Sequence, residues 1–183
     1  MNRINDFSNL SDFLRAWDDR SPGLNEGIHV SRGKQGNIST SGNLDEPTSA
    51  IVTPSCPEFM DYIEYGVRDL VKYLVYDMGL ITYSSCQGHL IGNELRLRNV
   101  GLLFKNQVER QWAESIIRLA AERINNRELG PHYLEVISDI VNSNTGSMET
   151  LEINFTHQGS YTSSYFQEAD RLCFGFISEL MKF

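Results

Sequence analysis

The sequence predicts an α+β fold: a small, mainly antiparallel four-stranded sheet with helices packed on one face, preceded by an N-terminal helix and a Gly/Ser-rich arm. The first observation is the order of apolar patterns, which after the arm reads helix, strand, strand, helix, strand, strand, helix. The second is that three helical patterns each begin at a capping-box spacing. The third is size, because 183 residues, 40% of them hydrophobic, suffice to bury one core.

The N-terminal part divides by composition. Residues 1–20 predict a short amphipathic helix, whose apolar residues recur at helical spacing: Leu10, Phe13, Leu14 and Trp17. Residues 21–53 predict a linker or long loop, because glycine, serine and asparagine replace large apolar side chains. We expect residues 1–50 to dock on the domain or to bind a protein partner, and residues 54–183 to form a single α+β domain.

The domain's first helix is predicted to begin at Ser-Cys-Pro-Glu, residues 55–58, where the proline occupies the first turn. One face of this helix is apolar, with Phe59, Ile63, Val67, Leu70, Leu74 and Met78. Its polar residues lie largely elsewhere, namely Asp61, Glu64, Arg68 and Lys72. Gly79 is a suitable terminator, and residues 80–85 then predict a short strand.

The middle of the chain predicts a strand followed by a helix. Residues 95–104 alternate apolar and basic side chains and then become wholly apolar, which is typical of a strand whose far end is covered on both faces. The capping-box spacing at residues 106–109 begins a helix that ends near residue 126. Its predicted inward stripe consists of Val108, Trp112, Ile116, Leu119, Ala120 and Ile124.

The last third predicts a hairpin and a final helix. Residues 132–141 and 150–156 read as paired strands joined by a turn near residues 145–146. The last helix begins at residues 164–167, and its inward residues are Tyr165, Ala169, Leu172, Cys173, Phe176 and Leu180. The uncovered sheet face is predicted to be polar and solvated, with Arg96, Arg98, Glu135, Asp139, Glu152 and Asn154.

Charge and cysteine content limit the functional classes. The net charge of -8 argues against broad, sequence-independent nucleic-acid binding, which depends on lysine and arginine replacing counterions. Three widely spaced cysteines, Cys56, Cys86 and Cys173, form neither a disulfide framework nor a zinc-type pair. This pattern suits a reducing compartment. Since no apolar run approaches 18 residues, we expect a soluble cytoplasmic protein that does not enter a membrane.

The functional signal is concentrated in Ser-Ser-Cys-Gln-Gly-His, residues 84–89, at the end of a predicted strand. Gly88 permits a tight or left-handed backbone, and the two small serines let another group approach the main chain. Successive N–H groups here would form an anion-binding nest. We therefore predict a pocket for a nucleotide-like or otherwise anionic small molecule. Its predicted ligand-binding residues are Ser84, Ser85, Gln87, Gly88, Arg96 and Arg98.

Cys86 and His89 are the candidate catalytic residues of an alternative, a thiol enzyme. An imidazolium beside a thiol lowers the pKa of the thiol and makes it nucleophilic. The sequence does not identify an acid to orient the imidazole: Asp139 and Glu152 lie on neighbouring predicted strands, but nothing in the sequence brings either to His89.

Two further interpretations use the same residues. Cys86 and His89, with His132 or His157, have metal-ligating atoms, but no second closely spaced pair of ligands accompanies them, and we predict no metal site. In the structural interpretation, Cys86 is a small buried residue, the glycine makes a turn and His89 anchors the loop.

The element order over residues 58–157 and this hexapeptide resemble the third protein of the wybutosine pathway, a tRNA-modifying methyltransferase family. The family's hallmark, Ser-Ser-Cys-Ser-Gly-Arg, is matched by residues 84–89 in four of six positions. The resemblance implies S-adenosylmethionine as cofactor, a tricyclic guanine derivative in tRNA as substrate, and a pocket lined by Ser84, Ser85, Cys86 and Gly88. His89 stands where the family has arginine. A second functional class is a non-catalytic accessory subunit that attaches to a larger complex through residues 1–50.

Overall fold

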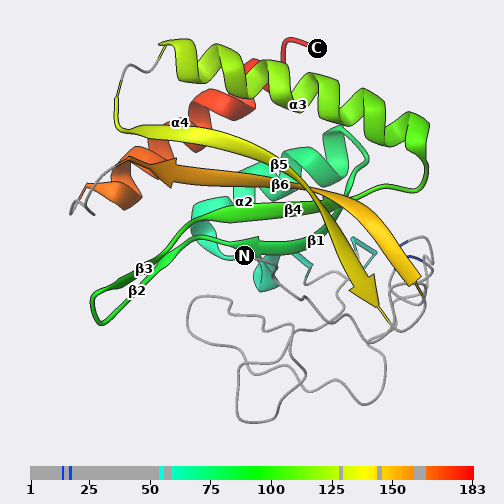
Figure 1. Ribbon diagram of the computed structural model, residues 1–183, viewed down its shortest axis with the longest axis horizontal. Coiled ribbons are helices and arrows are strands. Elements are labelled where there is room, and N and C mark those ends of the chain that lie inside the picture. The colour runs from blue at the N-terminus through cyan, green and yellow to red at the C-terminus, as the bar shows by residue number, and fades with distance from the viewer. Residues whose placement is uncertain are drawn as a thin grey trace.

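The computed structural model describes Leu14, Trp17 and residues 54–55, 59–127, 130–143, 146–158 and 164–183. Within these ranges the predicted α+β class is confirmed by a four-stranded antiparallel sheet of order β1-β4-β6-β5 (Figure 1). The strands are β1 (Ile81–Cys86), β4 (Asn99–Leu103), β6 (Gly146–His157) and β5 (His132–Ser143). The long β5–β6 hairpin confirms the pair predicted at residues 132–156 and extends it at its turn.

Three helices cover one face of this sheet (Figure 1). They are α2 (Tyr65–Lys72), α3 (Gln107–Arg127) and α4 (Tyr165–Leu180). A 3-10 turn, η1 (Phe59–Tyr62), precedes α2, and a π-helical segment, η2 (Tyr73–Asp77), follows it, so the first predicted helix is interrupted rather than continuous. Gly79 ends the segment with a φ of 71°, as predicted. None of the helices in the described ranges is long and apolar enough to span a bilayer.

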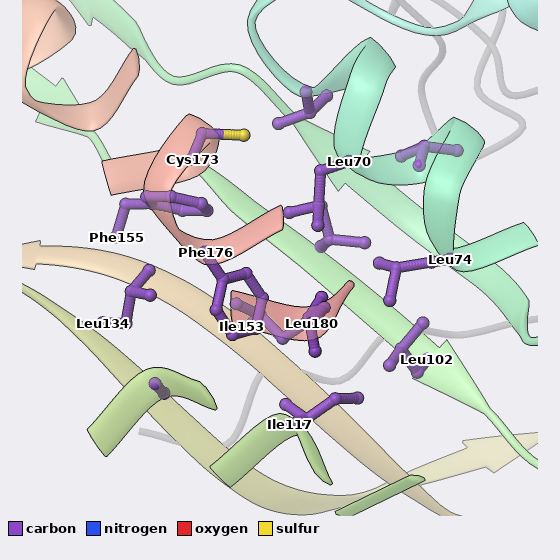
Figure 2. Packing of buried hydrophobic residues seen from close by; sticks show 14 of the residues in the cluster. Leu70, Leu74, Leu102, Ile117, Leu134, Ile153, Phe155, Cys173, Phe176 and Leu180 are labelled. Carbon is purple, nitrogen blue, oxygen red and sulfur yellow. The ribbon is translucent and has the colours of Figure 1, made fainter. Parts of the chain in front are cut away.

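The core lies between these helices and the sheet (Figure 2). Leu70 and Leu74 meet Phe176 and Leu180 of α4 over the inner face of β4 and β6 (Figure 2). All six residues predicted to face inward from α4 are buried, as are five of the six predicted for the first helix, Met78 being half-buried. Burying each large aliphatic or aromatic side chain contributes about 1.5–3 kcal/mol, which makes this layer the main source of stability.

The inward stripe predicted for α3 is partly wrong. Val108, Trp112 and Leu119 are exposed. The residues that α3 buries are Ala113, Ile117, Ala120, Ala121 and Ile124. The alanines let α3 lie close to α4, where Ile124 Cδ1 would be 3.0 Å from a Cβ added to Gly175. Because α3 and α4 lie close together, α3 buries the face that carries small residues, and the larger apolar side chains beside that face stay exposed.

The strand predicted at residues 95–104 is also wrong, because it is two strands. β3 (Glu94–Arg96) pairs with β2 (His89–Ile91) in a separate hairpin that projects from one end of the sheet, and β4 begins only at Asn99 (Figure 1). The hairpin turn has Gly92 at its first position with a φ of 61°, as two-residue turns of type II′ require.

The opposite face of the sheet has its own small cluster of Ile81, Tyr83 and Leu103, against which Leu14 and Trp17 pack. These two residues are helical, and the rest of residues 1–53, where the N-terminal helix and the linker were predicted, lies outside the described residues. A Cβ on Gly101 would lie 2.6 Å from Tyr83 Cε1, so only glycine at this position leaves room for the tyrosine ring. The Tyr83 hydroxyl then donates to Glu152 Oε1 across β4, at 2.9 Å.

Candidate functional site

The hexapeptide spans the end of β1, a two-residue loop and the start of β2. Gly88 has a φ of 87°, which confirms the predicted left-handed backbone. A Cβ at this position would also lie 3.0 Å from the Arg96 carbonyl oxygen and 3.1 Å from the Arg98 nitrogen. The loop therefore needs glycine both for its φ and for its contact with the strand connection beyond β3.

A carboxylate that the sequence placed on a polar face is buried against this loop. Glu64, the residue before α2, is 4% exposed. The Gln87 N–H donates to Glu64 Oε2 at 2.7 Å, and Glu64 Oε1 lies 2.9 Å from His89 Nε2. This second contact lacks hydrogen-bond geometry, which leaves Oε1 a buried oxygen with no hydrogen-bond partner among the described residues. The predicted position of Glu64 is wrong because the first helix is interrupted there: the chain bends at Ile63, and Glu64 has an extended backbone with φ of -62° and ψ of 142°.

The N–H groups predicted to form an anion nest are directed at groups of the protein itself. The Gln87 N–H is used by Glu64, and the Gly88 N–H is directed at Cys86 Sγ, 3.4 Å away. An anion entering this loop would also meet the buried carboxylate. The groups that face the loop are therefore a carboxylate oxygen of Glu64 and the sulfur of Cys86, and such groups attract a cation rather than an anion.

Arg98, predicted to rim the pocket on a solvated face, is only 2% exposed, so that prediction is wrong. Its Nε donates to the Gln87 carbonyl at 3.1 Å and its Nη2 to Asp170 Oδ1 at 2.6 Å. Its backbone N–H donates to the Tyr165 hydroxyl at 2.7 Å. The break between β3 and β4 turns Arg98 inward, where it ties the loop to α4.

Three other predicted ligand-binding residues, Arg96, Ser84 and Ser85, lie on two different strands. Arg96 is exposed on β3 and lies directly opposite His89 in the β2–β3 register. Ser84 and Ser85 are half-buried in the β1–β4 ladder, opposite Gly101 and Val100. The serines thus contribute small side chains to the sheet.

Three side chains converge at the loop. The ligating atoms of Glu64, Cys86 and His89 all lie within 4.8 Å of one another. Glu64 precedes Cys86 by 22 positions and belongs to the turn before a helix, so only the packing of α2 on the loop reveals it. The one signal in the sequence is a charged residue between the apolar Ile63 and Tyr65.

The thiol is protonated rather than activated in this environment. Burial raises the pKa of Cys86, and Glu64 raises it further, while the Gly88 N–H and the charge of Arg96 act in the opposite direction. The predicted imidazolium–thiolate pair would have the opposite direction of pKa shift. His89 instead lies against Glu64.

The histidines considered as further ligands lie elsewhere. His132 and His157 are register partners at the ends of β5 and β6, with ring centroids 4.7 Å apart. Burial lowers the pKa of His132, and its neighbour His157 lowers it further. Neither belongs to the cluster at the loop.

Comparisons of the chain with protein-family models, curated proteins and solved structures found no match. The resemblance of the hexapeptide to the methyltransferase hallmark therefore stays a prediction, as does the use of S-adenosylmethionine. Function is inferred from the geometry of the loop and its neighbours.

Proposed function

We propose that this protein is a metal-binding domain in which Glu64, Cys86 and His89 hold a divalent transition-metal ion. The convergence of these three donors within 4.8 Å carries the proposal. A carboxylate oxygen, a thiolate sulfur and an imidazole nitrogen together match the ligand types of zinc better than those of magnesium or calcium, which prefer oxygen alone. This proposal replaces the expectation of no metal site, because Glu64 supplies the ligand that the sequence did not reveal.

The burial of Glu64 supports a cation at this position. Removing a carboxylate from water is costly unless its oxygens are fully paired, and Oε1 has no hydrogen-bond partner among the described residues. A metal ion contacting Oε1 offsets that cost. His89 Nε2 already lies 2.9 Å from the same oxygen, so both atoms lie at a separation compatible with two ligands of one ion.

Three protein ligands favour a chemical role over a purely structural one. Structural zinc sites use four protein ligands, whereas catalytic sites use three and leave a position for water or substrate. A metal ion in such a site acts as a Lewis acid or activates a bound water. The proposed centre is therefore of the open type.

The test is metal binding by the full chain. Chelator-treated protein is dialysed against zinc, bound metal is counted by elemental analysis, and cobalt is added separately to detect the thiolate-to-cobalt charge-transfer band. We expect one equivalent of metal in the wild type, and loss of binding in Glu64→Gln and Cys86→Ser. Cys173→Ala is the matched control, because this thiol lies in the core on α4. Circular dichroism verifies the folding of each variant. A folded wild type that retains no metal would contradict the proposal.

A thiol enzyme is the second candidate, and one contact favours it. Glu64 Oε1 lies 2.9 Å from His89 Nε2, so an acid of the kind that the sequence did not identify stands beside the imidazole. Labelling with iodoacetamide separates the two candidates. A metal ligand reacts slowly without metal, because burial raises the pKa of Cys86, and is protected further when zinc binds. A catalytic thiol at Cys86 would instead react with iodoacetamide much faster than Cys173 in the protein without zinc.

A further inference from the structure

The exposed arginine beside the proposed metal centre has no side-chain hydrogen bond or ion pair within the described ranges. The Arg96 side chain forms no hydrogen bond or ion pair with a described residue, whereas that of Arg98, two positions later, is buried and bound to Gln87 and Asp170. Arg96 and His89 are direct partners across the β2–β3 hairpin. Side chains directly opposite in an antiparallel pair share a face, with Cβ atoms about 4.5–5.5 Å apart. The Arg96 side chain therefore begins next to that of His89, one of the three proposed ligands.

The charge of the centre then determines what it attracts. Glu64 and a Cys86 thiolate together neutralise a divalent cation, and His89 binds metal as a neutral imidazole. Arg96 adds one positive charge, and it forms no ion pair with an acid among the described residues.

We propose that the centre binds an oxyanion group, a phosphate or a carboxylate, with one oxygen on the open position of the metal and another on the Arg96 guanidinium. This inference rests on the proposed metal site. The planar fork of arginine matches both oxyanions through paired hydrogen bonds. The anionic ligand expected from the sequence is thus recognised by the metal and Arg96, and the loop N–H groups stay with Glu64 and Cys86.

The experiment is calorimetric titration of inorganic phosphate, acetate and adenosine monophosphate into zinc-loaded and zinc-free protein. Zinc content is measured first in every sample, so that loss of the metal and loss of the oxyanion are distinguished. We expect phosphate to bind the zinc-loaded wild type and not the zinc-free protein. Adenosine monophosphate binding more tightly than phosphate would assign the oxyanion to a nucleotide, and tighter acetate binding would assign it to a carboxylate.

Arg96→Gln tests the role of the guanidinium. We expect it to retain zinc, since Arg96 is not a ligand, and to weaken phosphate binding by about tenfold or more, the loss of a charge-assisted hydrogen bond. Arg96→Lys should restore part of the binding. Lys72→Gln removes the same charge at the exposed end of α2 and should leave binding unchanged. Zinc-loaded wild type that binds none of the three probes, or that binds no better than Arg96→Gln, would overturn the inference and leave the metal site standing.

Discussion

Glu64 and Gln87 hold each other across the junction between α2 and the loop. The Gln87 N–H donates to Glu64 Oε2 at 2.7 Å, while the Gln87 side chain accepts a hydrogen bond from the Gly66 N–H in the first turn of α2, at 3.2 Å. Glu64 makes no cap bond of its own, so a residue of the loop between β1 and β2 caps this helix. The helix start and the proposed metal ligands therefore form one unit.

Gln87→Ala should destabilise the protein by about 1 kcal/mol, the usual cost of losing a helix cap, because it leaves the Gly66 N–H without its acceptor. Urea unfolding measures the change. Gln167→Ala is the control, because Gln167 is exposed in the first turn of α4, and its effect should be smaller. Equal effects of the two substitutions would show that the Gln87 cap contributes nothing.

Gly88→Ala should cost more than Gly79→Ala. Both glycines have a positive φ, 87° and 71°, so both substitutions carry a backbone cost of about 1–2 kcal/mol. A Cβ added at Gly88 would approach backbone atoms, at 3.0 and 3.1 Å, whereas nothing lies within 4 Å of a Cβ at Gly79. Comparing the unfolding free energies of the two variants isolates the crowding, and equal losses would contradict the tight fit of the loop.

Asp170→Ala should destabilise the protein more than Glu168→Ala. Although the Asp170 side chain is 65% exposed, its partner Arg98 is 3% exposed, and removing the acid leaves a buried guanidinium without its counter-charge. We expect a loss of about 1–3 kcal/mol. The Glu168–Arg171 pair on the same helix is more exposed on its basic side and should contribute less than about 1 kcal/mol. If Asp170→Ala lost no more unfolding free energy than Glu168→Ala, the contact between Arg98 and Asp170 would not stabilise the packing of the loop on α4.

The sequence predicts an element correctly where the apolar residues of that element are also the residues that it buries. The apolar pattern of α4 is sufficient to predict its buried residues, because the predicted inward stripe is also the face that packs on the core. On α3, periodicity alone could not separate two adjacent arcs, and the alanine-rich one was buried because it allows close packing. The hairpin at Gly92 was missed because alternation continues across the break between β3 and β4. Neither the burial of Glu64 nor that of Arg98 is visible in local periodicity, since tertiary packing determines both.

The cluster on which the metal-site proposal rests includes two residues that the sequence analysis named, Cys86 and His89, and one that it did not, Glu64. Cys86, Gly88 and His89 are adjacent in sequence, so the end of a strand brings them together without further information. The third member of the cluster, Glu64, comes from a different element. Of the two arginines considered, only Arg96 is exposed, because Arg98 follows the point where the chain turns inward.

Stability should fall on acidification through the histidine pair at the ends of β5 and β6. Burial lowers the pKa of His132 in the folded state, and so does the neighbouring His157, with Arg171 acting in the same direction and Glu168 opposing. The unfolded chain therefore binds a proton more readily, and the folded state loses stability as the pH falls below about 6.5, the ordinary value for histidine. His132 Nε2 has no hydrogen-bond partner among the described residues, so His132→Phe removes the titration without breaking a bond at that atom. Urea unfolding between about pH 7.5 and about pH 5 should show a shallower decline in the variant than in the wild type. Parallel curves for the two proteins would rule out His132 as the source of the pH dependence.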